Sequence, residues 1–285
     1  MSKYHLMHCV PHPRLHGLVG YREVIDTIKW GLEQLGHEVS YALNRFEPSA
    51  INIIFGAHML PPDFMERLPR NTIVYNFEQM RGLQPQEMRP EMAFLARRFR
   101  IWEYSTANMD AWKTLDAVSV HHVPVGYAPI LSRIPRAVEQ DIDVLIYGVP
   151  GPERMDAFHD VAMAGYTTLF VCGLYGAARD ELISRAKLVL NVNLHTHAQI
   201  FEVVRVSYLF ANRKAVLATM HPQTVVDEDI RTAVKFTSPE NLVNDCAYLI
   251  DNVAARHALE EAGYQCITRA ERDIRAILES ALGAA

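Results

Sequence analysis

The sequence predicts an α/β protein of two lobes, each built on a parallel sheet that helices cover. Apolar, β-branched stretches alternate with longer segments of helical period along the whole chain. The length of 285 residues is long for one core and comfortable for two domains. A polar stretch with a proline, at 131–141, interrupts the alternation near its middle. We therefore expect domains over 1–135 and 136–285, with the last helix able to pack back on the first domain.

The first half of the chain contains six short apolar runs that predict strands. They lie at 4–10, 38–43, 51–56, 72–77, 101–105 and 118–125. Between the first two runs, residues 20–36 predict a helix, because Val24, Ile28 and Leu32 fall on one helical face and Gly36 suits the C-terminal stop. The segment "WEYSTANMDAW" predicts the end of a strand and then a helix N-terminus, with Ser105 or Thr106 as its cap.

The second half repeats the alternation. Strands are expected at 143–148, 167–173, 187–193, 214–219 and 233–237, and helices at 152–164, 177–186, 198–211 and 267–283. Each strand ends in a loop at which the next helix begins. Doubly wound sheets with this pattern bind nucleotides at the carboxyl ends of their strands.

Composition and charge narrow the class of protein. The 28 Lys and Arg against 33 Asp and Glu give a net charge of −5, which argues against nucleic acid as the main partner. The first residues lack the apolar core of a secretory signal, and no apolar run is long enough to span a bilayer, so we expect a cytoplasmic protein. The four cysteines are scattered without metal-ligand spacing, and no bound metal is expected.

The run "FEVVR" places two opposite charges, Glu202 and Arg205, in a helix that is apolar on almost every side and therefore buried. The two side chains form either an ion pair or the polar part of a ligand site. Because the segment follows a strand, its N-terminus should lie at the carboxyl edge of the sheet, where backbone N–H groups favour an anion. Arg205 could bind the phosphates of a nucleoside diphosphate, and Glu202 could accept hydrogen bonds from ribose hydroxyls.

A resemblance to a known family rests on this part of the chain. The run "LFVCGLYGAARDELISRAKLVLNVNLHTHAQIFEVVRVSYLFANRKAVLAT", with "DVLIYGVPGPERMDAF" before it, resembles the C-terminal half of bacterial GT-B glycosyltransferases of the group 1-like kind. The resemblance covers about residues 141–220. It implies two Rossmann-like lobes that face each other across a cleft. It also implies metal-independent transfer from a nucleotide sugar, with the donor mainly in the C-terminal lobe and the acceptor in the N-terminal one.

The resemblance carries donor-binding roles over to particular positions. Glu202 matches the acidic residue near the donor ribose, and Arg205 the basic residue near its phosphates. Gly148 and Arg154 of "YGVPGPER" match the loop after the first strand of this lobe. His195 matches the histidine after "LN-x-x", where it would contact the sugar or the pyrophosphate.

Other positions carry weaker signals for donor contact. Gly176 and Arg179 fall in the "YGAARD" loop, and Arg179 could equally lie on a solvated helix face. Gly17 and Gly20 resemble the glycines after the first strand of GT-B folds, although such glycines are often only turn formers.

The sequence also departs from the family's pattern. Many retaining GT-B enzymes have two Glu residues eight positions apart, but Leu194 and Phe210 stand eight positions either side of Glu202. The family's retaining motif is therefore missing.

Candidate catalytic groups lie in the first half. Glu78 follows the strand at 72–77, at a carboxyl end, where a carboxylate could take the proton of an acceptor hydroxyl. His12 and His16 lie in the loop after the first strand and could do the same. Glu78 could instead cap the next segment or bind acceptor hydroxyls, and either histidine could simply face solvent.

We therefore predict a glycosyltransferase without a bound cofactor that uses a UDP- or GDP-sugar and a hydroxyl acceptor on a glycan, a lipid-linked precursor or a protein. The alternatives are a nucleotide-sugar epimerase or hydrolase, a binding module without turnover, and a transferase that acts on a hydroxylated DNA base. The last would need a local basic surface, for which Arg97, Arg98 and Arg100 are the candidates.

Overall fold

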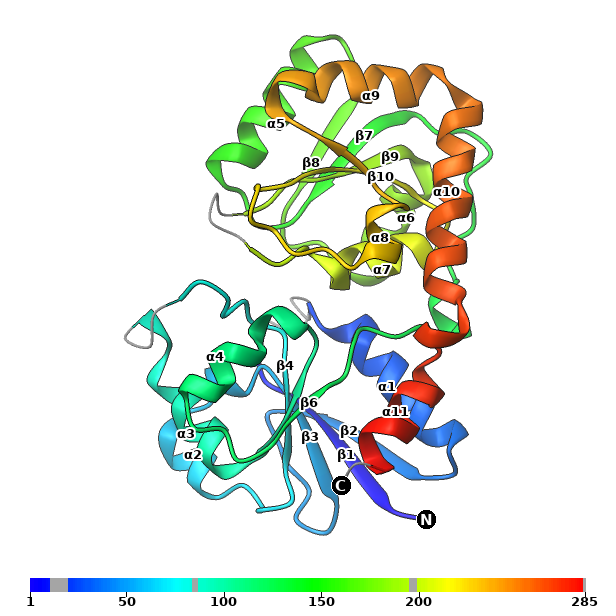
Figure 1. The fold of residues 1–285 in the computed structure, drawn as a ribbon. Coiled ribbons are helices and arrows are strands. Elements are labelled where there is room, and N and C mark those ends of the chain that lie inside the picture. Colours follow the sequence, from blue (N-terminus) through cyan, green and yellow to red (C-terminus); the bar gives the residue numbers. More distant parts are fainter. Residues whose placement is uncertain (11–19, 84–86, 195–198, 284–285) are drawn as a thin grey trace. The chain divides into compact units, whose positions relative to one another are not determined.

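The computed structural model describes residues 1–10, 20–83, 87–194 and 199–283. Their contacts divide the chain into two compact units, residues 1–128 with 270–285, and residues 129–269 (Figure 1). The division lies before the predicted boundary at 135 because residues 133–135 are held within the second unit. There Asn212 Oδ1 accepts hydrogen bonds from the backbone N–H of Arg133 at 2.9 Å and of Ile134 at 2.8 Å.

The first unit contains a six-stranded parallel sheet. Its strands are β1 (Lys3–His8), β2 (Glu38–Leu43), β3 (Ile51–Phe55), β4 (Ile73–Asn76), β5 (Arg100–Glu103) and β6 (Val120–His122). All six predicted strands are present, in the order β2-β1-β3-β4-β5-β6. This order places a topological switch point between β1 and β3, where doubly wound sheets form their ligand crevice.

Helices cover both faces of this sheet. They are α1 (Arg22–Gln34), α2 (Pro62–Glu66), α3 (Pro90–Arg98), α4 (Met109–Thr114) and α11 (Ile274–Gly283). Figure 1 shows α2, α3 and α4 on one face and α1 with α11 on the other. The helix predicted at 20–36 is confirmed, and Gly36 after it has a φ of 79°. Helices α2 and α3 were not predicted, because segments of five and nine residues are too short to show a helical period clearly. The helix start predicted at Ser105 or Thr106 is confirmed, since the Ser105 hydroxyl accepts from the N–H of Ala107 and caps a 3₁₀ turn that leads into α4.

The helix predicted at 267–283 is wrong in its extent. Helix α10 (Val253–Thr268) ends at the second residue of this range, Ala270–Arg272 form one 3₁₀ turn, and α11 follows. The break arises from tertiary contact, since the backbone N–H of Tyr127 donates to the carbonyl of Arg272 at 2.6 Å. Helix α11 then packs so closely on α1 that a Cβ at Gly31 would lie 2.7 Å from Leu278 Cδ1.

The second unit contains a five-stranded parallel sheet. Its strands are β7 (Ile142–Tyr147), β8 (Thr168–Val171), β9 (Ala186–Asn191), β10 (Ala215–Thr219) and β11 (Lys235–Thr237). Their order is β11-β10-β9-β7-β8, so the switch point of this sheet lies between β7 and β9. All five predicted strands are present. The register pairs Leu145 with Val189, so the last residues of β7 and β9 stand side by side.

The described residues of this unit form six helices. They are α5 (Pro152–Met163), α6 (Gly176–Arg185), α7 (Val203–Ala211), α8 (Glu228–Arg231), α9 (Leu242–Asp251) and α10. In Figure 1, α5 and α9 lie on one face of the sheet and α6 and α7 on the other. No helix in the described part of the chain is long and apolar enough to span a bilayer.

Helix α7 begins later than its predicted start at 198. Residues 199–201 pair instead with Val225, whose N–H donates to the carbonyl of Gln199 at 2.9 Å and whose carbonyl accepts from the N–H of Phe201 at 3.2 Å. An apolar run is compatible with either backbone, and contact with Val225 decides between them. As a result Glu202 is the N-cap of α7 rather than a residue inside it.

Candidate functional site

The switch point of the second sheet is where four of the predicted donor residues, Gly148, Arg154, Glu202 and Arg205, meet. Gly148 follows β7 with a φ of 138°, a conformation that L side chains rarely adopt. A Cβ there would lie 2.8 Å from Arg154 Nη1 and 3.0 Å from Arg205 Nη2. The backbone therefore approaches two guanidinium groups so closely that only glycine fits without a shift.

Arg154 lies beneath this site, with 2% of its side chain exposed. Its Nε donates to the carbonyl of Val192 at 2.8 Å, and its Nη1 donates to the carbonyl of Val149 at 2.8 Å. Its Nη2 donates to Glu202 Oε1 at 2.8 Å. Burial lowers the pKa of Arg154, while the Glu202 carboxylate acts in the opposite direction. Arg154 thus fastens the ends of β7 and β9 to Glu202, and little of its surface remains for a ligand.

Glu202 and Arg205 form the ion pair that the sequence allowed. Arg205 Nη2 lies 2.8 Å from Glu202 Oε2, with 17% and 21% of the two side chains exposed. Arg205 Nη1 donates to Asn191 Oδ1 at 2.9 Å, and the guanidinium carbon lies 5.0 Å from the centre of the Tyr147 ring. Arg205, rather than Arg154, is therefore the guanidinium that a ligand can reach.

The charges at this switch point do not balance. Two guanidinium groups, of Arg154 and Arg205, share the single carboxylate of Glu202. One positive charge remains, at the N-terminus of the nine-residue helix α7. A helix N-terminus with a surplus cation favours an anion such as a diphosphate.

Two asparagines that sequence reasoning did not single out also belong here. Asn191 ends β9 and Asn193 follows it, and both are buried. Within the described residues, Asn191 Nδ2 and Asn193 Oδ1 have no hydrogen-bond partner. The motif "LN-x-x" was the available signal, since an Asn at a strand's carboxyl end lies at the predicted ligand edge.

Arg179 does not lie on a solvated helix face, so that alternative is wrong. Only 6% of the residue is exposed, and its guanidinium carbon lies 4.8 Å from the centre of the Tyr208 ring. Its Nη2 donates to Asp180 Oδ1 at 2.8 Å. Gly176, at the start of α6, has a φ of 60° with open space around it, so its backbone conformation alone favours glycine. Donor contact by Gly176 or Arg179 stays a prediction.

Four predicted site residues, His12, His16, Gly17 and His195, lie outside the described residues. Among the residues that the structure does describe, no group of three or more His, Cys, Asp or Glu could hold a metal ion.

In the first unit, Glu78 lies just past the carboxyl end of β4, as predicted. Its Oε1 accepts a hydrogen bond from the Tyr21 hydroxyl at 3.1 Å, and 38% of its side chain is exposed. His58 Nε2 lies 3.6 Å from the same oxygen, which is too long for a hydrogen bond. Burial lowers the pKa of His58, against the raising effect of Glu78, so His58 is mainly neutral at pH 7. Glu78 is thus an acidic side chain that a ligand can reach.

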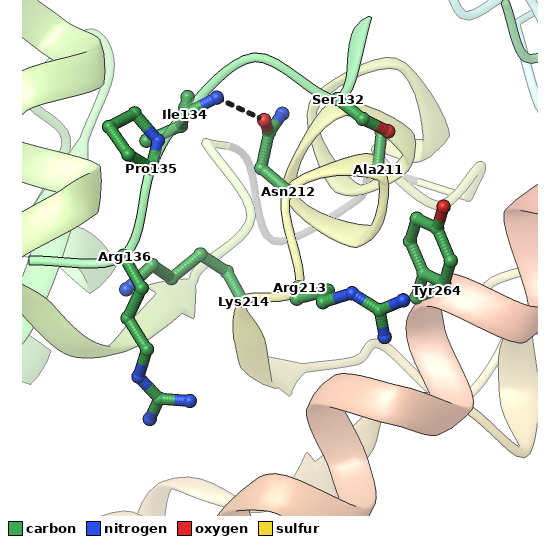
Figure 2. Close-up of a pocket in the computed structure, with 9 residues that line it drawn as sticks. All are labelled: Ser132, Ile134, Pro135, Arg136, Ala211, Asn212, Arg213, Lys214 and Tyr264. Carbon is green, nitrogen blue, oxygen red and sulfur yellow. Dashed lines mark hydrogen bonds between the residues drawn. The ribbon is translucent and has the colours of Figure 1, made fainter. Parts of the chain in front are cut away.

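A cavity of about 240 Å³ lies elsewhere, within the second unit (Figure 2). Its lining residues are Ser132, Ile134, Pro135, Arg136, Ala211, Asn212, Arg213, Lys214 and Tyr264. Lys214 precedes β10, so the cavity lies at the amino edge of the sheet, opposite to Gly148. Its cations already have acceptors: Arg136 pairs with Glu260, and Lys214 Nζ donates to the carbonyl of Ala186 at 2.7 Å. The cavity is therefore separate from the predicted donor site.

No protein-family model and no curated protein matches the sequence. Solved structures match it over nearly its whole length. AviGT4, a glycosyltransferase involved in avilamycin A biosynthesis, is 15% identical, with a TM-score of 0.61 over 99% of this chain and 96% of its own. HepE of Anabaena, in complex with UDP and glucose, is 10% identical, with a TM-score of 0.64 over 100% of both chains. A mutant of BGT from T4 phage, in complex with UDP-glucose, is 10% identical, with a TM-score of 0.59 over 99% of both chains.

At such identities the likeness concerns the fold. Two parallel sheets covered by helices, each with a switch point, agree with it over the described residues. The predicted fold class is confirmed, and this chain has the GT-B glycosyltransferase fold.

Proposed function

We propose that this chain is a glycosyltransferase that moves a sugar from a nucleoside-diphosphate sugar to an acceptor hydroxyl on a glycan, a lipid-linked precursor or a protein. The observation that carries the proposal is the surplus positive charge of Arg205 at the N-terminus of α7, on the switch point of the second sheet. UDP is the favoured nucleotide, because HepE and BGT, which share the fold, hold UDP-glucose or its parts.

In this proposal the second unit binds the donor. The planar fork of Arg205 donates to the diphosphate oxygens, together with the first N–H groups of α7. The exposed part of the Glu202 carboxylate accepts hydrogen bonds from the ribose hydroxyls. Arg154 does not touch the donor and holds Glu202 in place from below.

The first unit supplies the base. Glu78 takes the proton of the acceptor hydroxyl as the acceptor oxygen forms its bond to the anomeric carbon. The bond between the anomeric carbon and the diphosphate oxygen breaks, and its electron pair leaves with the diphosphate. Arg205 and the N-terminus of α7 stabilise that charge, and for this reason we propose that no metal ion is required.

Donor binding is tested by calorimetry with UDP-, GDP-, dTDP- and CDP-sugars. We expect selective binding that Arg205→Ala weakens by about 10-fold or more, because a charge-assisted hydrogen bond contributes roughly 1.5–3 kcal/mol. Arg185→Ala is the matched control, since Arg185 pairs with Asp141 on the surface of the same unit. Absence of binding, or equal affinities for Arg205→Ala and wild type, would remove the donor site from α7.

Turnover is tested by release of UDP from UDP-glucose, first with water as acceptor and then with candidate acceptors. Glu78→Gln should lower kcat by about 100-fold or more while donor affinity stays unchanged. A chelator should leave the rate unaltered. Turnover that no acceptor accelerates would favour the hydrolase alternative, and binding without turnover would favour a binding module.

A further inference from the structure

Glu103 is a buried carboxylate that the proposed reaction does not use. It ends β5, and its exposed fraction is 0%. Its Oε2 accepts from Asn76 Nδ2 at 2.8 Å and from Trp112 Nε1 at 2.7 Å. Its Oε1 accepts from the backbone N–H of Ser105 at 3.0 Å and from Asn108 Nδ2 at 3.0 Å. Four donors, from the end of β4, from the segment after β5 and from α4, thus bind this one carboxylate.

Two of these donors also hold the loop that carries Glu78. Asn76 Oδ1 accepts from the N–H of Glu78 at 3.1 Å. Asn108 Nδ2 donates to the carbonyl of Glu78 at 2.8 Å. Asn108 Oδ1 accepts from the N–H of Met80 at 2.8 Å and of Arg81 at 3.0 Å. The backbone on both sides of Glu78 is therefore fixed by two amide side chains.

The carboxylate decides which way these amides point. Above the pKa of about 7 to which burial raises this carboxyl group, Glu103 is ionised and only accepts hydrogen bonds, so the NH₂ groups of Asn76 and Asn108 must face it. Their carbonyl oxygens must then face the loop, where backbone N–H groups need acceptors. A glutamine at 103 would place its own NH₂ group among four donors and remove this constraint. Asn76 and Glu103 are also register partners in neighbouring strands, so the arrangement is built into the sheet.

We propose that Glu103 is a positioning residue for Glu78, acting through Asn76 and Asn108 to hold the loop at 77–81. Its catalytic consequence rests on the proposed function, in which Glu78 is the base. Beyond the hydrogen bond from the Tyr21 hydroxyl, the partly exposed side chain of Glu78 takes its position from the backbone that carries it. A shift of about 1 Å in a reacting group lowers a rate by about 100-fold, so loss of these hydrogen bonds should slow the reaction.

Amide hydrogen exchange tests the clamp without any substrate. In Glu103→Gln, the amides of Glu78, Met80 and Arg81 should exchange at least about 10-fold faster, because a lost buried hydrogen bond costs roughly 1–3 kcal/mol. The amides of β1 and β3 should keep their protection. Glu66→Gln, an exposed substitution in α2 of the same unit, is the control and should change none of these. Unaltered exchange of the loop amides in Glu103→Gln would overturn the proposal.

A second variant decides the matter if Glu103→Gln does not fold. Asn108→Ala removes the link between carboxylate and loop but leaves Glu103 three donors. We expect faster exchange at Met80 and Arg81 with continued protection of the Ser105 amide, which donates directly to Glu103. Equal acceleration at all three amides would mean general loosening and would contradict a specific clamp.

The tie to catalysis is tested with UDP-glucose and water as acceptor. Glu103→Gln should lower kcat by about 10-fold or more at unchanged donor affinity, because the donor residues belong to the other unit. In a Glu78→Ala background the same substitution should cause no further loss. If the loss of kcat in the double variant were the product of the two single losses, positioning through Glu78 would be excluded. If wild type releases no UDP, the proposed function fails, and the exchange experiments still decide whether the clamp exists.

Discussion

At the residue scale, the ion-pair and ligand-site interpretations of "FEVVR" are compatible. Glu202 divides its two oxygens between Arg154, which is buried, and Arg205, which is partly exposed. The ion pair therefore orients Arg205 toward the predicted anion and leaves part of its positive charge uncompensated. Loss of Glu202 would leave two adjacent guanidinium groups without a counter-charge, which is strongly unfavourable for the buried one.

Gly148 gives a prediction for the donor site. Gly148→Ala should lower the free energy of unfolding by roughly 1–3 kcal/mol, because the new Cβ meets both guanidinium groups in a strained backbone. Donor affinity should fall with it. Gly165→Ala is the control, since Gly165 has a φ of 94° but nothing within 4 Å. Urea denaturation and calorimetry measure both effects, and equal losses in the two variants would show that only the backbone conformation matters.

Two buried groups of the first unit, Glu103 and His8, should change the free energy of unfolding in opposite directions as pH rises. Burial raises the pKa of Glu103 from 4.5 to about 7, so the folded state binds an extra proton between these values and stability falls as pH rises. Burial lowers the pKa of His8 from 6.5 to about 4, so the unfolded state binds the extra proton and stability rises with pH. The two effects largely cancel between about pH 4.5 and 6.5.

Glu103→Gln should remove the contribution of Glu103 and leave that of His8. Relative to wild type, the variant should gain stability as pH rises from 4.5 to 6.5, by up to about 1.4 kcal/mol per pH unit. Urea denaturation at several pH values measures this difference, in which the other titrating groups drop out. Parallel profiles for the two proteins would mean that Glu103 titrates near its ordinary value.

At the element scale, the C-terminal end of α7 fixes the segment that enters the second unit. Asn212 follows α7 and accepts from the backbone N–H groups of Arg133 and Ile134, one of which is drawn in Figure 2. Its Nδ2 donates back to the carbonyl of Tyr208 at 2.8 Å. One side chain therefore joins a helix to a segment about 80 residues away in sequence.

Asn212→Ala should lower the free energy of unfolding by roughly 1–3 kcal/mol, because two backbone N–H groups lose their acceptor. Asn212→Asp keeps the acceptor and should recover most of that loss. Chemical denaturation measures the stability, and hydrogen exchange at Arg133 and Ile134 locates the change. Equal losses in both variants would mean that the hydrogen bond from Asn212 Nδ2 to the carbonyl of Tyr208 provides the stability instead.

At the scale of the whole molecule, the chain leaves its first unit and returns to it. Residues 270–285 belong with residues 1–128, and α11 packs on α1. Stability of the first unit thus depends on a helix at the far end of the sequence.

Leu278→Ala should show this dependence. Leu278 is fully buried in α11, so the substitution should cost about 2–5 kcal/mol and accelerate amide exchange in β1 to β6. Leu249→Ala in α9 is the matched substitution in the second core and should accelerate exchange in β7 to β11 instead. Exchange that rises throughout the chain in either variant would mean that the two units unfold together.

The sequence by itself determined the parallel strands, the helices α1, α5 and α6, and the positions of Glu78 and Arg205 after the ends of strands. Hydrophobic period and loop position are local properties, so a single sequence expresses them. Only tertiary structure decided the start of α7 at Val203, which depends on Val225, and the break before α11. It also decided the contacts of Glu103, whose partner Asn76 lies 27 residues away, and of Arg154, whose partner Glu202 lies 48 away. Such contacts follow from which strands are neighbours, and strand order is set by packing of the whole chain rather than by any local pattern.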